Sequence, residues 1–233
     1  MKLAIMQPYF FPYIGYFQLI KAVDTFVVYD EIEYTKKGWI NRNRILVNGK
    51  DEYITIPLKK ASDYLFVNER YLADTWNIEK HKILNRIKES YRKALYFNEI
   101  FQIIEDCLLF ENKNIFEFIL NSIKVVNSYL DIKTPIVAVS TLSLNKELKA
   151  ENKVIEICKT RNADTYINPI GGTKLYNKDM FFKNNIKLFF LKSNDIKYKQ
   201  FNNEFVPWLS IIDVTMFNHK EEIVKMLDSY DLI

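Results

Sequence analysis

The sequence has little of what marks several broad classes of protein. Its 233 residues include two cysteines, two histidines and five glycines. No apolar run approaches the ~20 residues that span a bilayer, and Gln7, Pro8 and Pro12 interrupt the apolar residues at the amino end. We therefore expect a soluble, cytoplasmic protein without membrane insertion.

The charge of the chain is close to balanced. The chain has 33 Lys and Arg residues and 29 Asp and Glu residues, which gives a net charge of +4. The basic residues are scattered along the chain rather than clustered, which disfavours a nucleic-acid-binding surface. Apolar residues are plentiful: 48% of the chain is hydrophobic, enough to bury the core of one large domain.

The scarce reactive residues limit the chemistry. Cys107 and Cys158 fall in predicted helices without metal-like spacing, so buried thiols are expected, and Cys158 has no evident base partner. His81 and His219 are the two side chains of a type that titrates near neutral pH. His219 stands at an expected helix start and is interpreted as structural.

The opening of the chain predicts a Rossmann-like βαβ unit. Residues 3–6 suit a buried strand, prolines 8 and 12 then exclude a regular helix or central strand, and a helix over 14–22 leads to an apolar strand over 25–29. Ligands bind beyond the carboxyl ends of the strands in open parallel sheets. The polar residues expected there are Gln7, Tyr9, Tyr13, Tyr16 and Asp30. Simple packing of an aromatic loop is the alternative.

Residues 36–44 form the best candidate for a ligand-binding loop. Cations could meet phosphate or carboxylate charge, amides could orient polar groups, and an indole offers a stacking face. The residues concerned are Lys36, Lys37, Trp39, Asn41, Arg42, Asn43 and Arg44. A solvated basic loop is the alternative.

The rest of the chain predicts an α/β fold with a mainly parallel sheet. A β-hairpin is expected over 44–57 around the Asn48-Gly49 turn, and helices over 74–93, 98–110 and 112–130. We interpret 74–133 as a helical insertion in a single domain, 1–233. Strands over 136–139, 165–168 and 187–191 then alternate with helices over 148–161 and 178–185, and a last helix is expected over 218–232.

Two further features are candidates for the site. The Gly171-Gly172 pair directly follows a predicted strand, which suggests close approach to a ligand or a positive-φ turn, although neither GxxxxGK[ST] nor GxGxxG is present. The expected ligand contacts are Asn168, Gly171, Gly172 and Tyr176; a plain tight turn is the alternative. Asp213 lies in an apolar run and must find a partner, either Lys37, Arg42, a substrate amine or a helix end.

Several motifs resemble the WbqC-like protein family. They are MQPYFFPYIGYFQLI, DTFVVYD, KKGWINRNRI, Trp76 with His81, the Gly-Gly pair and LSIID over 209–213, so the similarity covers essentially the whole chain. The resemblance implies a product of a bacterial surface-polysaccharide (O-antigen, lipopolysaccharide) gene cluster. It also implies an aminoacyl (glycyl) transfer directed at a sugar, and it makes His81 the candidate catalytic base.

Three functions stay open at this point. The first is transfer of an acyl group to a nucleotide-linked amino sugar, in which His81 or Asp30 takes a proton from the attacking amine. The second is non-catalytic binding of a nucleotide sugar or glycan precursor, and the third is nucleotidyl transfer. A catalytic site predicts that His81, Asp30 and residues 36–43 converge on one pocket.

Cofactors and donors are less well defined. The acyl donor could be an adenylate, a thioester or a charged tRNA, and ATP use rests on a loose analogy with adenylating folds whose HIGH histidines are absent here. The carboxylates of Asp30, Glu31, Glu33 and Asp213 form no recognised metal motif.

Overall fold

A mainly parallel sheet lies at the centre of the computed structural model, which describes residues 1–145 and 147–233. Its six strands have the order β5-β2-β1-β6-β7-β8. β1 (Lys2–Met6) pairs in parallel with β2 (Thr25–Val28) and β6 (Thr165–Pro169); β5 (Ile136–Ala138) and β7 (Lys187–Ser193) extend the sheet in the same sense. The predicted α/β class is confirmed.

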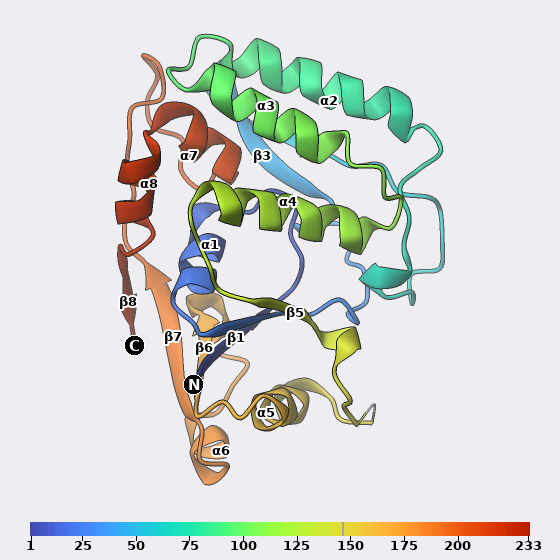
Figure 1. The fold of residues 1–233 in the computed structure, drawn as a ribbon, viewed down its shortest axis with the longest axis vertical. Helices are drawn as coiled ribbons and strands as arrows, with labels where there is room; N and C mark the ends of the chain where they lie inside the picture. The colour runs from blue at the N-terminus through green and yellow to red at the C-terminus, as the bar shows by residue number, and fades with distance from the viewer. Residues whose placement is uncertain (146) are drawn as a thin grey trace.

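Helices cover both faces of this sheet (Figure 1). α1 (Ile14–Lys21) and α4 (Ile115–Tyr129) lie on one side, and α5 (Ala150–Thr160) and α6 (Lys178–Lys183) on the other. Successive strand residues point to opposite faces, so Ala4 packs in the α1 core, whereas Leu3 and Ile5 pack in the α5 core. Burial on both faces explains the consecutive apolar residues 3–5 of β1 and 26–28 of β2.

The predicted hairpin forms a two-stranded sheet of its own. β3 (Arg42–Val47) and β4 (Lys50–Thr55) are antiparallel, and the turn residues Asn48 and Gly49 have φ values of 50° and 77°. Two positive φ values are what a type I′ turn requires. Ile45 and Ile54 are buried in the core that contains α1.

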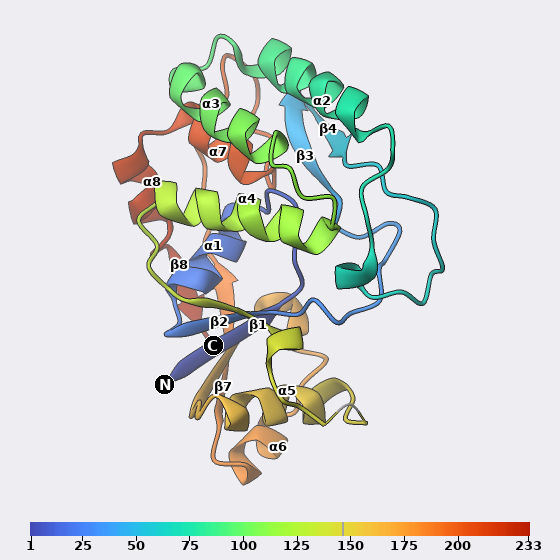
Figure 2. The same cartoon turned by 45° about the vertical axis from the view of Figure 1, so that its right-hand side comes forward.

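The predicted helical region contains α2 (Trp76–Tyr91), α3 (Phe97–Leu108) and α4, preceded by the short η1 (Val67–Glu69). α2 and α3 lie beside the hairpin at one end of the molecule, while α4 lies against the layer of α1 (Figure 2). The helices are confirmed; their description as an insertion within one domain stays a prediction.

The carboxyl-terminal part of the chain differs from the single helix expected over 218–232. α7 (Ile211–Phe217) ends first, His219 is extended and its Nδ1 accepts a hydrogen bond from the Glu221 amide at 3.4 Å, and α8 (Lys220–Met226) follows. β8 (Tyr230–Leu232) then pairs antiparallel with the end of β7. Pairing with a distant strand therefore overrides the helical periodicity of the last residues.

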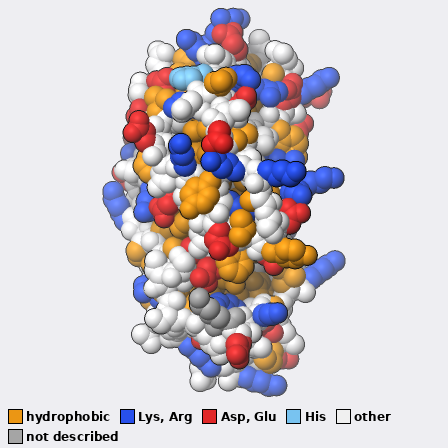
Figure 3. All heavy atoms as spheres, turned by 90° about the vertical axis from the view of Figure 1, so that its right-hand side faces the viewer, with side chains coloured by type: hydrophobic (Ala, Val, Ile, Leu, Met, Phe, Trp, Pro, Cys, Tyr) orange, Lys and Arg blue, Asp and Glu red, His pale blue; other side chains and the backbone are white. Residues whose placement is uncertain are grey.

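Charge is mixed over the surface. On the face shown in Figure 3, Lys and Arg side chains are interspersed with Asp and Glu. Within the part of the chain that the structure describes, no helix is long and apolar enough to cross a bilayer.

Candidate functional site

A cleft opens where the order of strands reverses. From β1 the chain continues to β2 and β5 on one side, whereas β6 and β7 lie on the other, so β1 and β6 are the neighbours at the switch point. Their last residues, Met6 and Pro169, both line two adjoining cavities beyond the carboxyl ends of the strands. This crevice is where ligands bind in open α/β sheets.

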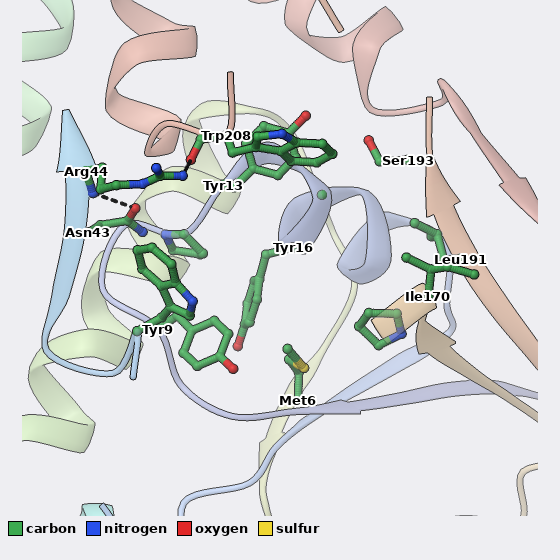
Figure 4. Close-up of a pocket in the computed structure, with 14 residues that line it drawn as sticks. Met6, Tyr9, Tyr13, Tyr16, Asn43, Arg44, Ile170, Leu191, Ser193 and Trp208 are labelled. Carbon is green, nitrogen blue, oxygen red and sulfur yellow. Dashed lines mark hydrogen bonds between the residues drawn. The ribbon is translucent and has the colours of Figure 1, made fainter. Parts of the chain in front are cut away.

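The first cavity, which we call the aromatic cavity, has a volume of about 310 Å³. It is lined by Met6, Tyr9, Pro12, Tyr13, Gly15, Tyr16, Trp39, Asn43, Arg44, Pro169, Ile170, Leu191, Ser193 and Trp208. Three tyrosines and two tryptophans converge there from separate parts of the chain (Figure 4). Such flat faces suit the stacking of a sugar or a base.

The loop before α1 is fixed by hydrogen bonds to its backbone. The Tyr16 hydroxyl donates to the Gln7 carbonyl at 2.9 Å, and the Asn43 Nδ2 donates to the carbonyls of Phe10 (3.0 Å) and Phe11 (2.9 Å). The rings of Tyr9 and Tyr16 are 5.9 Å apart. Asn43 therefore ties the loop to β3 from its place at the cavity wall.

Arg44 joins the two tryptophans of the aromatic cavity. Its guanidinium lies 5.5 Å from the Trp39 ring, its Nη1 pairs with Asp51 at 2.9 Å, and its Nη2 donates to the Trp208 carbonyl at 3.2 Å. A guanidinium can stack and donate in its plane at once. The side chain thus connects the hairpin to the loop before α7.

Trp208 is held in an unfavourable backbone conformation. Its φ is 61°, a value that bulky residues rarely adopt. The next residues anchor it: the Ser210 amide donates to the Arg44 carbonyl at 2.9 Å, and the Ser210 hydroxyl to the Phe11 carbonyl at 2.7 Å. Strain that surrounding contacts maintain is frequent at ligand sites, and here it sets the indole 5.1 Å from the Tyr13 ring.

The second cavity, which we call the lysine cavity, has a volume of about 490 Å³. It is lined by Ile5, Met6, Gln7, Tyr9, Tyr29, Ile32, Ala150, Lys153, Val154, Asn168, Pro169, Gly171, Gly172, Leu175 and Tyr176. Met6, Tyr9 and Pro169 belong to both cavities. The two cavities therefore form one cleft.

At the second residue of the glycine pair, Gly172, a side chain is excluded by a close neighbour. Residues 170–172 form a short 3-10 helix, and a Cβ on Gly172 would lie 1.7 Å from the Asn168 Nδ2. The Asn168 Oδ1 accepts a hydrogen bond from the Tyr166 hydroxyl at 2.9 Å. The close contact that the structure shows at this turn is with the Asn168 side chain, and the expected contact with a ligand stays a prediction.

The tyrosine hydroxyls of the cleft are hydrogen-bond donors at neutral pH. Burial raises the pKa of Tyr9, Tyr13 and Tyr176, and it raises the pKa of Tyr16 well above its ordinary value. Protonated phenols can donate to a substrate oxygen but cannot act as bases.

The two predicted catalytic residues lie outside this cleft. Asp30 is fully buried; its Oδ1 accepts from the Ser140 amide and its Oδ2 from the Asn68 Nδ2, each at 3.0 Å, and it opens to a different cavity of about 470 Å³. His81 is exposed on α2 and lines neither cavity of the cleft. Their catalytic roles stay predictions.

Part of the cationic segment supports its own loop. The Arg42 Nε donates to the Gly38 carbonyl at 3.0 Å and its guanidinium lies 4.5 Å from the Tyr53 ring, while Lys37 is exposed. The buried Asn41 donates to the Ile56 carbonyl at 2.8 Å. Of residues 36–44, three line the cleft: Trp39, Asn43 and Arg44.

Asp213 is the centre of a buried network. Its carboxylate accepts from the hydroxyls of Tyr91 (2.8 Å) and Tyr198 (2.6 Å) and from the Gln200 Nε2 (2.7 Å). Burial raises the pKa of Asp213, although all three hydrogen bonds favour the ionised form. The amino end of α7 is capped instead by the Ser210 hydroxyl, which accepts from the Ile212 amide at 3.2 Å.

Sequence reasoning missed Trp208 and Lys153 as members of the cleft. Trp208 follows Pro207 in a stretch without helical or strand periodicity. This position gives only a weak indication that the indole is exposed rather than part of the core. Lys153 lies four residues before Ile157 and therefore on the apolar side of its helix. A charged residue on the apolar side of a helix was the signal in the sequence that could have indicated a role for Lys153. Across residues 1–145 and 147–233, no group of three or more His, Cys, Asp or Glu side chains is arranged to hold a metal ion.

Comparison with known proteins places the chain in a family. Residues 7–225 match the WbqC-like protein family. The chain belongs to this family. The Mycobacterium tuberculosis protein Rv1507c is 29% identical over 223 residues, which cover 93% of each chain, and its name states no activity. No solved structure matches this WbqC-like chain.

Proposed function

We propose that this WbqC-like protein acts in bacterial surface-polysaccharide biosynthesis as a transferase that binds a nucleotide-linked amino sugar between β1 and β6. The observation that carries the proposal is the cleft itself. It lies at the switch point of a parallel sheet and joins an aromatic cavity to a cavity with a buried cation. Stacking faces and a cation are the two features that such a ligand needs.

The proposed reaction is transfer of an acyl group, glycyl or another aminoacyl group, to the sugar amine. The amine nitrogen attacks the carbonyl carbon of an activated donor and the new C–N bond forms. The leaving group departs with the electron pair of the broken bond, and the amine passes a proton to a base in solution or on the protein. Tyr9 and Tyr13 supply protonated hydroxyls on the cavity wall that can donate to the oxyanion of the tetrahedral intermediate.

A second candidate is non-catalytic binding of the same class of ligand. It is favoured by one observation: no His, Asp or Glu is among the described residues that line the two cavities. A binding protein needs no proton acceptor, whereas acyl transfer to an ammonium group needs one in solution or on the protein.

The first experiment is a thermal-shift screen of the purified protein against UDP- and dTDP-linked amino sugars. Binding of a ligand to the folded protein raises Tm. Trp39→Ala should weaken binding roughly 5- to 100-fold through loss of stacking, whereas Tyr64→Ala, which removes an exposed aromatic outside both cavities, should change it less than twofold. The absence of any shift with every nucleotide sugar tried would overturn both candidates.

Offering acyl donors to a bound sugar then separates the candidates. A transferase increases the mass of the sugar by one acyl group, while a binding protein returns it unchanged. His81→Ala tests the predicted base: a lower kcat with unchanged KM would support the role, and unchanged kcat would assign proton transfer to another group.

A further inference from the structure

Lys153 is an unusual lysine. It is 4% exposed and lies in the first turn of α5, and it is the one charged side chain among the described residues that line the lysine cavity. Lysine is seldom fully buried unless its charge is paired. Its position therefore requires an explanation.

The protein itself supplies little to balance this charge. The Nζ donates to the Asn145 carbonyl at 3.2 Å, and among the described residues no carboxylate oxygen lies within 4.0 Å of it. An ammonium group has three donors, so two remain for another partner. A buried charge without a counter-ion is costly, and a bound anion would remove that cost.

The surroundings of Lys153 suit an anion. Gln7 and Asn168 bring amides to the cavity wall, and Tyr29 and Tyr176 bring hydroxyls that burial keeps protonated by raising their pKa. α5 begins at Ala150 on the same wall, and Lys149 makes no side-chain cap, so the positive end of the helix adds to the lysine charge. The nearby Glu151 carboxylate is occupied by the Asn177 amide at 2.6 Å and does not line the cavity.

We propose that the lysine cavity is an oxyanion-binding subsite in which Lys153 holds a phosphate or carboxylate group. This extends the proposed function, because the subsite adjoins the aromatic cavity through Met6, Tyr9 and Pro169. The oxyanion has two possible sources: the diphosphate of a ligand whose ring occupies the aromatic cavity, or the carboxylate of a free amino acid that serves as acyl precursor.

The test is calorimetric titration of the full-length protein with pyrophosphate, UDP and glycine. Lys153→Met removes the charge and keeps an unbranched side chain; Lys159→Met removes the same charge from the exposed end of the same helix. Lys153→Met should weaken binding of the recognised oxyanion about 10- to 100-fold, and Lys159→Met should leave it within twofold. Binding of pyrophosphate and UDP identifies a phosphate subsite; binding of glycine alone identifies a carboxylate subsite.

A measurement on the unaltered protein covers the case in which Lys153→Met does not fold. Hydrogen exchange with pyrophosphate or glycine present should slow at residues 151–153 and 170–172. Protection elsewhere, or binding that Lys153→Met leaves unchanged, overturns the subsite. If Lys153→Met binds nucleotide sugars, pyrophosphate and glycine as well as the unaltered protein does, the subsite fails and the proposed function stands. If no nucleotide sugar binds the unaltered protein but binding of pyrophosphate is still weakened by Lys153→Met, the proposed function fails and the subsite stands.

Discussion

Single residues set the outline of the cleft through steric and electrostatic fit. Gly172 leaves room for Asn168, Asn43 ties two carbonyls of the opening loop, and Trp208 tolerates a positive φ because its neighbours are anchored. The two glycines of the pair differ sharply: a Cβ on Gly171 would meet nothing within 4 Å. They therefore provide a matched test.

Gly172→Ala should destabilise the protein and Gly171→Ala should not. The new methyl group must displace the buried Asn168 side chain, at a cost of about 1–3 kcal/mol for an overpacked site. Urea denaturation measures the free energy of unfolding of each variant. Equal stability of the two variants would show that Asn168 moves aside freely.

The two thiols should be unreactive in the folded protein. Burial raises the pKa of both Cys107 and Cys158 to about 12, so at pH 8 about one thiol in ten thousand is ionised. Iodoacetamide should modify neither cysteine within the time that it modifies both in urea, as mass spectrometry can show. Rapid modification of Cys158 under native conditions would reopen its candidacy as a nucleophile.

At the scale of elements, one connection depends on a buried network. The chain between β7 and α7 has no helix or strand over 194–210, and Asp213 holds it through Tyr198 and Gln200. Gln200 in turn accepts from the Val206 amide at 2.7 Å. This connection carries Trp208 to the aromatic cavity, so the network supports the cleft from behind.

Asp213→Ala should cost about 2–4 kcal/mol of stability, because three donors, two of them fully buried, lose their acceptor. Asp179→Ala is the matched control, since Asp179 is also a first-turn aspartate but is exposed; its change should stay within about 0.5 kcal/mol. Chemical denaturation gives both values. A loss confined to the control's range would mean that the network contributes little.

The same network predicts a pH dependence. Burial raises the pKa of Asp213 above its ordinary value, so the folded state holds this proton more tightly than the unfolded state. The stabilisation that the protonated Asp213 gives to the folded state is fully present below the ordinary pKa of an aspartate. It is lost as pH rises through the raised pKa that Asp213 has in the folded protein. The stability of the unaltered protein minus that of Asp213→Asn should therefore fall with rising pH in urea denaturation, and a rise would contradict the assignment.

At the scale of the whole molecule, the cleft unites distant parts of the chain. The opening loop, the segment before β3, the end of β6 and the loop before α7 supply Tyr9, Trp39, Pro169 and Trp208. Of the three tryptophans, Trp76 alone is apart from the cavity, packed 5.2 Å from Phe118. Intrinsic fluorescence can therefore report on the cleft.

A ligand in the aromatic cavity should quench tryptophan emission. Trp39→Phe and Trp208→Phe should each remove part of the quenching, because both indoles line the cavity, while Trp76→Phe should leave its amplitude unchanged. Titration with a nucleotide sugar identified by thermal shift provides the measurement. Quenching that disappears in Trp76→Phe would place the ligand elsewhere.

Local patterns predicted most elements because their causes are local. The Asn48-Gly49 turn, the proline-broken strand at Gln7 and the helices over 76–129 follow from backbone preference and periodicity. The last residues were mistaken for a helix because strand pairing of Tyr230 with Ser193 joins positions far apart in the chain.

The sequence by itself determined the family, the α/β class and the polar opening loop, since these depend on motifs and short-range spacing. Tertiary structure decided which residues meet. It brought Trp208 and Lys153 to the cleft and left Asp30 and His81 outside it. The physical reason is that strand order determines which loops are neighbours: β1 lies beside β6 at the switch point, and no pattern within either segment encodes that contact.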